Sequence, residues 1–369
     1  MKIVCAKNEM IDAIAIVSKA VSNRTPVPIL ECILLKADES GLKLIANDME
    51  LGIETAPIAS QIEEQGSVCL ESKMFSEIIR KLPDTQVAIH VDQMNVTRII
   101  SGKSEFKLIG QSAEEFPVLP LVEKNINYKI PSVTLKNLIR QTIFSVALEE
   151  TRPVLTGELF EIKNNQLSLV AVDGFRVSVR SVAIESENED KKVVIPAKTL
   201  NEISKILSTE KESEVMIYFT DCHVLFELET GIVVSRLLEG DFIKYEQAFA
   251  TDAPIRITAK RHELLSCLER ASLVARDAKK SPVSLKLDPR YMVISAQTDM
   301  GVFNEEIQVG NDYEELEISF NPKYLLDVLK VVESEEVIMN FSTPLSPCII
   351  KGFDTTDYSY LVLPLRQKS

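Results

Sequence analysis

The fold is decided by one pattern that occurs three times, at residues 42–48 (LKLIAND), 167–173 (LSLVAVD) and 292–298 (MVISAQT). Each copy is a strand-like run that reaches an alanine and then a polar turn. The alanines, Ala46, Ala171 and Ala296, are spaced by 125 residues in both steps. Self-similarity at a fixed period is the signature of a repeated structural unit. The chain is therefore expected to contain three copies of one unit.

A second marker repeats with the same period. In each copy a lysine opens a run that has apolar residues at helical spacing. These sets are Lys73 with Phe75, Ile78 and Leu82, Lys198 with Leu200, Ile203 and Leu207, and Lys323 with Leu325, Val328 and Val332. The lysines are again 125 residues apart. Two independent markers in one register make coincidence a poor explanation.

The rest of each copy combines one more helix with several strands. Helical stretches are expected at 7–22, 134–147 and 260–276, and alternating strand-like runs at 87–91, 215–219 and 337–341. We therefore predict an α+β fold of three repeated domains, each with two helices packed on antiparallel sheets. Prolines near the joins place these domains at 1–127, 128–249 and 250–369.

Composition limits the class of protein. The 369 residues carry a net charge of −14, which is the wrong sign for a protein that grips nucleic acid over its whole surface, so any DNA contact must be local. No stretch approaches the roughly 18 apolar residues of a membrane span, and the N-terminus lacks a signal-peptide pattern. We expect a cytoplasmic protein whose six cysteines, which form no CxxC pair, are small buried hydrophobic residues.

Charge is divided unevenly between the expected helices and the rest of the chain. The six helical segments carry a summed formal charge of +8, which leaves −22 on the remaining residues. This division fits a shape in which the helices face a polyanion. The alternative is that surface helices collect lysines near their C-termini, where the helix dipole favours cations. Arg24 and Arg152, each just past the first helix of a repeat, favour the functional interpretation.

Signals of catalysis are weak. The three histidines, His90, His223 and His262, lack the spacing of metal ligands, and the sequence contains no P-loop, GxGxxG or GxSxG motif. Two alternatives remain open beside a scaffold whose helices face a polyanion. One is a metal-dependent DNA-processing enzyme, which usually needs clustered carboxylates. The other is a repeat scaffold that binds proteins but not DNA.

Several short motifs resemble one protein family along the whole chain. They are 24–35 (RTPVPILECILL), 106–108 (FKL) with 115–117 (EFP), 172–177 (VDGFRV), 238–240 (LEG) and 361–366 (LVLPLR). Each motif is weak alone, but their order and the three-fold repeat together resemble the bacterial sliding clamps, the β subunits of DNA polymerase III. The resemblance implies a nucleoid-associated, non-catalytic processivity factor that uses no cofactor or metal.

The resemblance also implies that two subunits close head to tail into a ring whose helices line the hole. Twelve helices, each about 10 Å wide, would leave a hole of about 28 Å, which a DNA duplex can pass. Phe106 and Leu108 should meet Leu273 and Val274 of the partner subunit. The residues expected to contact the encircled DNA are Arg24, Lys73, Arg80, Lys136, Arg140, Arg152, Lys198 and Lys205.

A groove for short linear peptides is the last feature that the resemblance implies. Its ligands would come from the polymerase α subunit, the clamp loader, translesion polymerases and repair proteins. By position, the groove comprises Arg152, Leu155, Val172, Gly174, Phe175, Arg176, Val177, Ile243, Gln247, Ala248, Asn321, Tyr324, Leu345, Ser346, Leu361, Val362, Leu363, Pro364, Leu365 and Arg366. Aliphatic side chains would capture leucine and phenylalanine anchors, and arginines would orient carbonyl or acidic groups.

One stretch departs from the family's pattern. Residues 241–247 (DFIKYEQ) lack a proline and an arginine that many members carry near the groove. The peptide preference of this chain therefore does not follow from the family, whereas the fold does not depend on this stretch.

Overall fold

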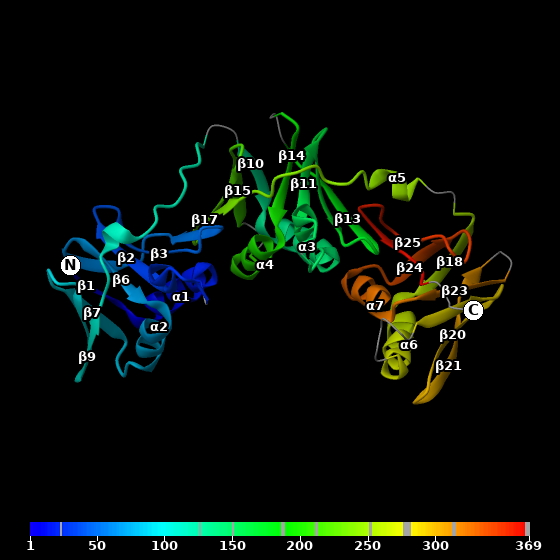
Figure 1. Ribbon diagram of the computed structural model, residues 1–369, viewed down its shortest axis with the longest axis horizontal. Coiled ribbons are helices and arrows are strands. Elements are labelled where there is room, and N and C mark those ends of the chain that lie inside the picture. The colour runs from blue at the N-terminus through cyan, green and yellow to red at the C-terminus, as the bar shows by residue number, and fades with distance from the viewer. Residues whose placement is uncertain are drawn as a thin grey trace. The chain divides into compact units, whose positions relative to one another are not determined.

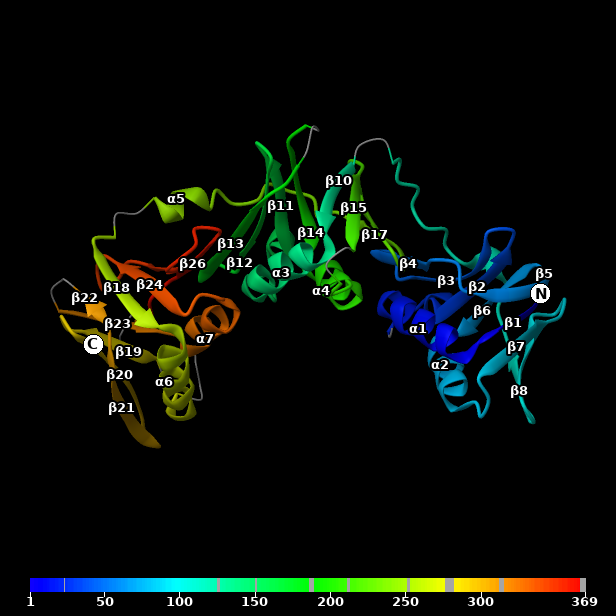
Figure 2. The same cartoon turned by 180° about the vertical axis from the view of Figure 1, so that it is seen from behind.

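The three-fold repeat is confirmed by the computed structural model, which describes residues 1–22, 24–124, 127–149, 151–185, 189–210, 213–250, 253–275, 282–311 and 315–365. The fold is α+β, and each repeat has the same order of elements (Figures 1 and 2). A strand is followed by a helix, three strands, a further strand, a second helix and three strands. Two strands and one short helix are additions to this plan.

The first repeat contains helices α1 (Lys7–Val17) and α2 (Ser72–Lys81) and strands β1 (Lys2–Ala6), β2 (Cys32–Asp38), β3 (Gly41–Asn47), β4 (Leu51–Thr55), the additional β5 (Ser60–Glu64), β6 (Gly66–Glu71), β7 (Gln86–Val91), β8 (Val96–Ser101) and β9 (Ser104–Ile109). The second repeat contains α3 (Ser132–Thr142), α4 (Ala197–Ile206), β10 (Asn127–Pro131), β11 (Gly157–Lys163), β12 (Gln166–Val172), β13 (Arg176–Ala183), β14 (Lys191–Pro196), β15 (Glu214–Phe219), β16 (His223–Leu228) and β17 (Gly231–Arg236).

The third repeat contains α6 (Arg261–Val274), α7 (Pro322–Val331), β18 (Ile255–Lys260), β19 (Val283–Leu287), β20 (Tyr291–Thr298), β21 (Gly301–Gln308), the additional β22 (Gly310–Asn311), β23 (Leu316–Phe320), β24 (Glu336–Phe341), β25 (Cys348–Gly352) and β26 (Tyr358–Val362). The short helix α5 (Glu246–Phe249) precedes it. Short 3-10 turns are η1 (Ser18–Ala20), η2 (Pro28–Glu31), η3 (Ala113–Glu115), η4 (Ile143–Ser145) and η5 (Pro153–Thr156).

The first helix of a repeat is shorter than its sequence pattern predicts. Helix α1 ends at Val17 and α3 ends at Thr142, and each is followed by a 3-10 turn. A hydroxyl side chain lies at both ends: Ser18 Oγ donates to the Ile14 carbonyl at 2.6 Å, and Thr142 Oγ1 donates to the Leu138 carbonyl at 2.8 Å. Such bonds to the carbonyl four residues earlier disfavour continuation of the helix. The expected stretch 260–276 reaches into residues outside those described.

Contacts within the chain divide it into two compact units, Met1–Thr134 with Asn201–Leu237, and Leu135–Leu200 with Leu238–Ser369. The first unit holds two antiparallel sheets with strand orders β10-β15-β16-β17-β4-β3-β2-β6 and β5-β1-β7-β8-β9. The second unit holds antiparallel sheets ordered β14-β11-β12-β13-β26-β25-β24-β18-β22 and β21-β20-β19-β23. The strands of the second repeat are thus shared between the units.

Neighbouring repeats are joined by continuous sheets. Strand β17 pairs with β4 of the first repeat, and β26 pairs with β13 of the second repeat. The register is the same at both junctions, because Gly231 lies opposite Thr55 and Tyr358 lies opposite Arg180. By the same plan β9 corresponds to β17 and β26, and β21 corresponds to β4 and β13. Both β9 and β21 are edge strands within the described sheets.

Within each unit a pair of helices covers the sheets. Helices α1 and α2 lie side by side in the first unit, and α6 and α7 lie side by side in the second (Figures 1 and 2). Apolar residues at helical spacing face the core, as Phe75 and Ile79 do in α2. No helix in the described part of the chain is long and apolar enough to cross a membrane. The described residues also contain no group of three His, Cys, Asp or Glu side chains arranged to hold a metal ion.

The cysteines follow the sequence expectation with one exception. Cys5, Cys32, Cys69, Cys267 and Cys348 are buried and free. Burial raises the pKa of the Cys69 thiol to about 12, so this thiol stays protonated. Cys222 is exposed, and the expectation that every cysteine is buried is wrong there. It lies in the turn that leads into β16, where side chains need not face the core.

Candidate functional site

The turn between β12 and β13 presents an aromatic side chain at the protein surface. The Asp173 carboxylate accepts the backbone N–H groups of Phe175 at 2.9 Å and of Arg176 at 3.0 Å, which closes the turn. Gly174 has φ +87°, a left-handed conformation that favours glycine. As a result the Phe175 ring is 56% exposed.

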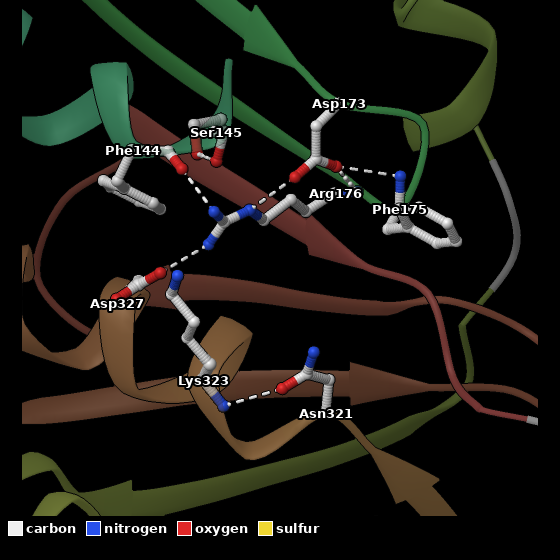
Figure 3. Close-up of polar contacts among 9 residues, drawn as sticks. Phe144, Ser145, Asp173, Phe175, Arg176, Asn321, Lys323 and Asp327 are labelled. Carbon is white, nitrogen blue, oxygen red and sulfur yellow. Dashed lines mark hydrogen bonds and ion pairs between the residues drawn. The ribbon is translucent and has the colours of Figure 1, made fainter. Parts of the chain in front are cut away.

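Arg176 is a buried cation that ties three elements together (Figure 3). Its Nε donates to Asp173 at 2.9 Å and its Nη1 donates to Asp327 of α7 at 2.7 Å. Its Nη2 donates to the Phe144 carbonyl in η4. The guanidinium also lies over the Phe144 ring and, 4.5 Å from its centroid, over the Tyr324 ring. The nitrogens of Arg176 are therefore engaged inside the protein, where they position β13 against α7.

An apolar surface is built on this arrangement. The Phe175 ring stacks on Tyr324, with centroids 6.3 Å apart and an angle of 25° between the rings. The carboxamide of Asn321 caps the first turn of α7, which carries Tyr324. Leu363, just past β26, donates its N–H to the Phe175 carbonyl at 2.8 Å, and its side chain is 37% exposed. Aromatic and aliphatic groups from three elements thus face solvent together.

A cluster of buried aliphatic residues lies in the neighbouring part of the same sheet. We call it the floor cluster; it comprises Leu155, Leu159, Val170, Val172, Val177, Val194, Ile349 and Leu361. The chain segment that contains α5 packs against it through Leu238, Phe242, Ile243, Tyr245, Ala248 and Phe249. The pairing of β13 with β26 places Val177 opposite Leu361, so residues from two repeats share this cluster.

The structure gathers most of the residues expected in the peptide groove. In the floor cluster or packed against it are Leu155, Val172, Val177, Ile243, Ala248 and Leu361. Around the exposed surface are Gly174, Phe175, Arg176, Asn321, Tyr324 and Leu363. Arg152 and Gln247 are exposed, before η5 and within α5 respectively.

The remaining residues of that set are placed differently. Val362 is fully buried in the core of the third repeat, facing away from the floor cluster. Leu345, which is 68% exposed, and Ser346 lie in the connection between β24 and β25. Pro364 follows Leu363, and Leu365 donates its N–H to the Ser319 carbonyl at 2.7 Å. Arg366 lies outside the described residues.

The segment that departs from the family's pattern forms part of this site. Residues 241–247 lead into α5, and Tyr245 turns its ring onto the floor cluster. The Tyr245 hydroxyl lies 3.5 Å from the Glu161 carboxylate, and burial raises the pKa of this phenol well above its ordinary value. Apolar packing thus holds the segment in place. Neither α5 nor the Tyr245 contact was predicted from the sequence.

The cationic residues expected to contact DNA lie on helices and on two loops. They are Lys73 and Arg80 on α2, Lys136 and Arg140 on α3, Lys198 and Lys205 on α4, Arg24 before η2, and Arg152 before η5. Arg140 forms an exposed ion pair with Glu333 at 2.5 Å, and Lys205 forms one with Glu202 at 2.6 Å. Exposed ion pairs contribute only about 0–1 kcal/mol, so phosphate groups can compete for these cations.

The four residues expected at a subunit interface lie in two places, on strand β9 and at the end of helix α6. Phe106, which is 39% exposed, and Leu108 belong to the edge strand β9. Leu273 is 65% exposed at the end of α6, and Val274 packs partly against the core of the third repeat. The same region of the third repeat contains the edge strand β21, which packs against α6.

Comparisons with known proteins cover the whole chain. Three domain families match it: the N-terminal domain of the DNA polymerase III beta subunit over residues 1–120, the central domain over 129–244 and the C-terminal domain over 246–366. The chain is 38% identical to the beta sliding clamp of Halalkalibacterium halodurans, with 95% of each chain covered, and 37% identical to that of Bacillus subtilis, with 99% and 100% covered.

Solved structures similar to this chain are members of the same family. A putative DNA polymerase III beta subunit from Eubacterium rectale has a TM-score of 0.96 at 42% identity, and the DNA polymerase sliding clamp of Bacillus subtilis has a TM-score of 0.96 at 37% identity. Both structures cover 100% of this chain and are themselves covered completely.

Proposed function

Since this chain belongs to the DNA polymerase III β subunit family, the sliding clamps, we propose that two copies close head to tail into a ring around duplex DNA. The chain acts as a sliding clamp, a processivity subunit of the polymerase holoenzyme that has no catalytic role itself. In this proposal the three domains run over 1–127, 128–249 and 250–369. The eight cationic residues on helices and loops make weak contacts with the encircled DNA.

Two of the edge strands, β9 and β21, carry the proposal of a ring. Each internal junction pairs the last strand of one repeat with the fourth strand of the repeat before it. Strand β9 is the last strand of the first repeat, and β21 is the fourth strand of the third repeat. If the plan continues, β9 of one copy pairs with β21 of another. Two such junctions close a ring of two subunits in which neither β9 nor β21 remains an unpaired edge, and an exposed sheet edge is a template for pairing.

The shared register specifies this junction residue by residue. Ser104 corresponds to Gly231 and Tyr358 in the two internal junctions, and Glu305 corresponds to Thr55 and Arg180. Ser104 should then lie opposite the partner's Glu305. Two residues further along, Phe106 should lie opposite the partner's Phe303.

The junction between β26 and β13 also indicates which side chains should meet at the proposed subunit junction. Tyr360 of β26 corresponds to Phe106, and Phe144, which follows α3, corresponds to Leu273 at the end of α6. The rings of Tyr360 and Phe144 lie 6.0 Å apart. This contact supports the expectation that Phe106 packs on Leu273 of the partner subunit.

A disulfide test examines this register directly. In a Cys222→Ser background, Lys107→Cys and Val302→Cys occupy opposite positions of the proposed junction. Mild oxidation should join the doubly substituted protein into covalent dimers and should leave either single substitution mostly unlinked. The pair Lys107→Cys with Glu305→Cys, three residues out of register, is the matched control. A dimer in solution that links the control pair as efficiently would contradict the proposed junction.

The second part of the proposal concerns protein partners. The exposed surface of Phe175, Tyr324 and Leu363, together with Leu345 and the floor cluster, serves as the groove for linear peptides. Its ligands are segments of the polymerase α subunit, the clamp loader, translesion polymerases and repair proteins. Exposed aromatic and aliphatic side chains on rigid elements are typical of the residues that contribute most to peptide binding. The buried Arg176 holds these elements in place.

A further inference from the structure

A row of four basic residues crosses the sheet of the first repeat. Lys2 lies opposite His90, His90 opposite Arg98, and Arg98 opposite Lys107, on the adjacent strands β1, β7, β8 and β9. Directly opposed residues share one face of a sheet, so these side chains stand in line. Arg98 and Lys107 are exposed and His90 is half-buried. We call these four residues the basic row.

Three residues of the basic row border a hollow. Lys2, His90 and Arg98 line a space of about 480 Å³ together with Glu64, Asp92 and neighbouring residues. Glu64 forms an ion pair with Lys2 at 2.7 Å. The Asp92 carboxylate accepts the backbone N–H groups of the following turn, from Met94 at 2.8 Å and Val96 at 3.0 Å. These two carboxylates therefore already have partners, whereas Arg98 and Lys107 present their charge to solvent in the single chain. Lys107 lies on the edge strand of the proposed subunit junction.

In the other two repeats, the positions aligned with the basic row hold mostly uncharged residues. The aligned residues are Asn127, Tyr218, Leu225 and Val234 in the second repeat, and Arg256, Asn340, Ile349 and Leu361 in the third. In the second repeat the last three of these are buried together with Val122. In the third repeat Ile349 and Leu361 belong to the floor cluster.

This comparison shows that the fold does not require cations in the basic row. Arg98 and Lys107 stand where Ile349 and Leu361 form the floor of the proposed peptide groove. Like charges directly opposite each other destabilise a sheet, so the row has a cost to the free protein. The basic row therefore offers cations where the third repeat offers apolar side chains, and cations favour a negatively charged ligand.

We propose that the basic row is a second docking surface, and that it binds an acidic peptide segment of a partner protein. Adjacent strands are about 4.8 Å apart, so the row spans about 14 Å, the length of four to five residues of extended peptide. Acidic side chains at alternate positions of such a segment reach Arg98 and Lys107 in turn. Next to the row, Val96 lies opposite Ile109, which is 86% exposed and offers contact to an apolar side chain of the peptide.

Nucleic acid fits this surface less well. Single strands bind through stacking of bases on aromatic rings and through a continuous cationic track. The strands of this sheet contain one phenylalanine or tyrosine, Phe106, which lies opposite the buried Ile99 on the other face. Glu64, Asp92 and Glu105 interrupt the positive charge on the face of the basic row.

The test uses the full chain and a short fluorescein-labelled peptide with glutamates at alternate positions and two leucines. Fluorescence anisotropy at low salt should show saturable binding. The double substitution Arg98→Gln, Lys107→Gln should weaken this binding by about tenfold or more, because charge-assisted contacts are lost. The matched control is Lys103→Gln, which removes an exposed cation from the turn between β8 and β9, outside the row. This control should bind the peptide as the unchanged protein does.

Four results would overturn the proposal. One is an absence of saturable binding to the unchanged protein. Another is equal affinity of the double variant and the unchanged protein, with thermal unfolding curves that show both to be folded. The third is a labelled oligothymidine that binds more tightly than the peptide and loses its affinity in the double variant, because the surface would then serve nucleic acid.

The fourth comes from a competition experiment. An unlabelled leucine-and-phenylalanine peptide of the clamp-binding kind should not displace the acidic peptide. Displacement by it would place the acidic peptide in the other groove and would also contradict the proposal.

Discussion

Glu158 is a carboxylic acid at a position that the other two repeats fill with an aliphatic side chain. The aligned residues Ile33 and Val283 are fully buried, and so is Glu158. Its Oε2 lies within hydrogen-bond distance of Thr142 Oγ1, at 3.0 Å, and its Oε1 has no partner in the described part of the chain. Burial raises the pKa of this carboxyl from its ordinary 4.5 to about 8. Glu158 is therefore mostly protonated in the folded protein at neutral pH.

This pKa predicts how stability depends on pH. A group whose pKa is raised on folding contributes most below its ordinary pKa, and this contribution is lost as pH rises through the folded value. We expect the free energy of unfolding to fall between about pH 5 and 8, with a slope of up to about 1.4 kcal/mol per pH unit from this group. Glu158→Gln should remove that slope, whereas the exposed Glu149→Gln should keep it. Parallel curves of chemical denaturation for all three proteins would contradict the assignment.

Arg176 and Arg180 are a matched pair of arginines on β13. Arg176 is 7% exposed and pairs with Asp173 and Asp327, whereas the partner of Arg180, Asp357, is 59% exposed. Removal of one partner from a buried ion pair leaves uncompensated charge, so we expect Arg176→Ala to lower the free energy of unfolding by about 3 kcal/mol or more. Arg180→Ala should cost less, about 1 kcal/mol through its ion pair, because the Asp357 carboxylate that it leaves behind is largely exposed to water. Equal losses for both substitutions in urea denaturation would show that the Arg176 network does not contribute as described.

At the scale of elements, the edge strand β9 carries the proposed interface. Phe106 and Leu108 are two residues apart and so point to one face of the strand. Phe106→Asp together with Leu108→Asp would place two charges against apolar groups of the partner, and light scattering should show monomers. The matched control is Met94→Asp, a change at a 79% exposed position in the turn between β7 and β8. It should remain a dimer. A dimeric double variant would mean that β9 is not at the interface.

The chain beyond β26 closes the proposed peptide groove. Deletion from Leu363 onward removes the N–H bond to the Phe175 carbonyl and an exposed leucine, and it leaves both β9 and β21 intact. We expect the truncated protein to lose binding of a clamp-binding peptide in calorimetry and to keep its dimer mass in light scattering. Normal peptide binding by the truncated protein would place the groove elsewhere.

Helices and strands are predicted well from the sequence where the same pattern occurs in all three repeats. The strands that hold Ala46, Ala171 and Ala296 and the helices that follow Lys73, Lys198 and Lys323 are all confirmed. The site is predicted only in part, because its polar contacts join residues far apart in the chain. Asp327 is 151 residues from Arg176, and no local pattern links the two. Helix α5 was missed for the same reason, since its packing on the floor cluster is a tertiary effect.

At the scale of the whole molecule, the proposed ring would separate retention on DNA from affinity for DNA. Tight binding through many phosphate contacts would fall steeply with salt and would oppose sliding. A net charge of −14 with cations concentrated on helices is consistent with weak, local contacts to the encircled duplex. In the proposed ring retention comes from topology, and the cationic residues should influence loading and sliding more than residence.

The central claim is tested most directly by the fate of the loaded protein when its DNA is cut. The protein is loaded on nicked circular DNA, isolated with it by gel filtration, and then treated with a restriction enzyme that cuts once. The ring predicts that the protein stays on the circle and leaves after linearisation, and that blocked DNA ends restore its retention. Equal retention on circular DNA and on linear DNA with free ends would contradict the account.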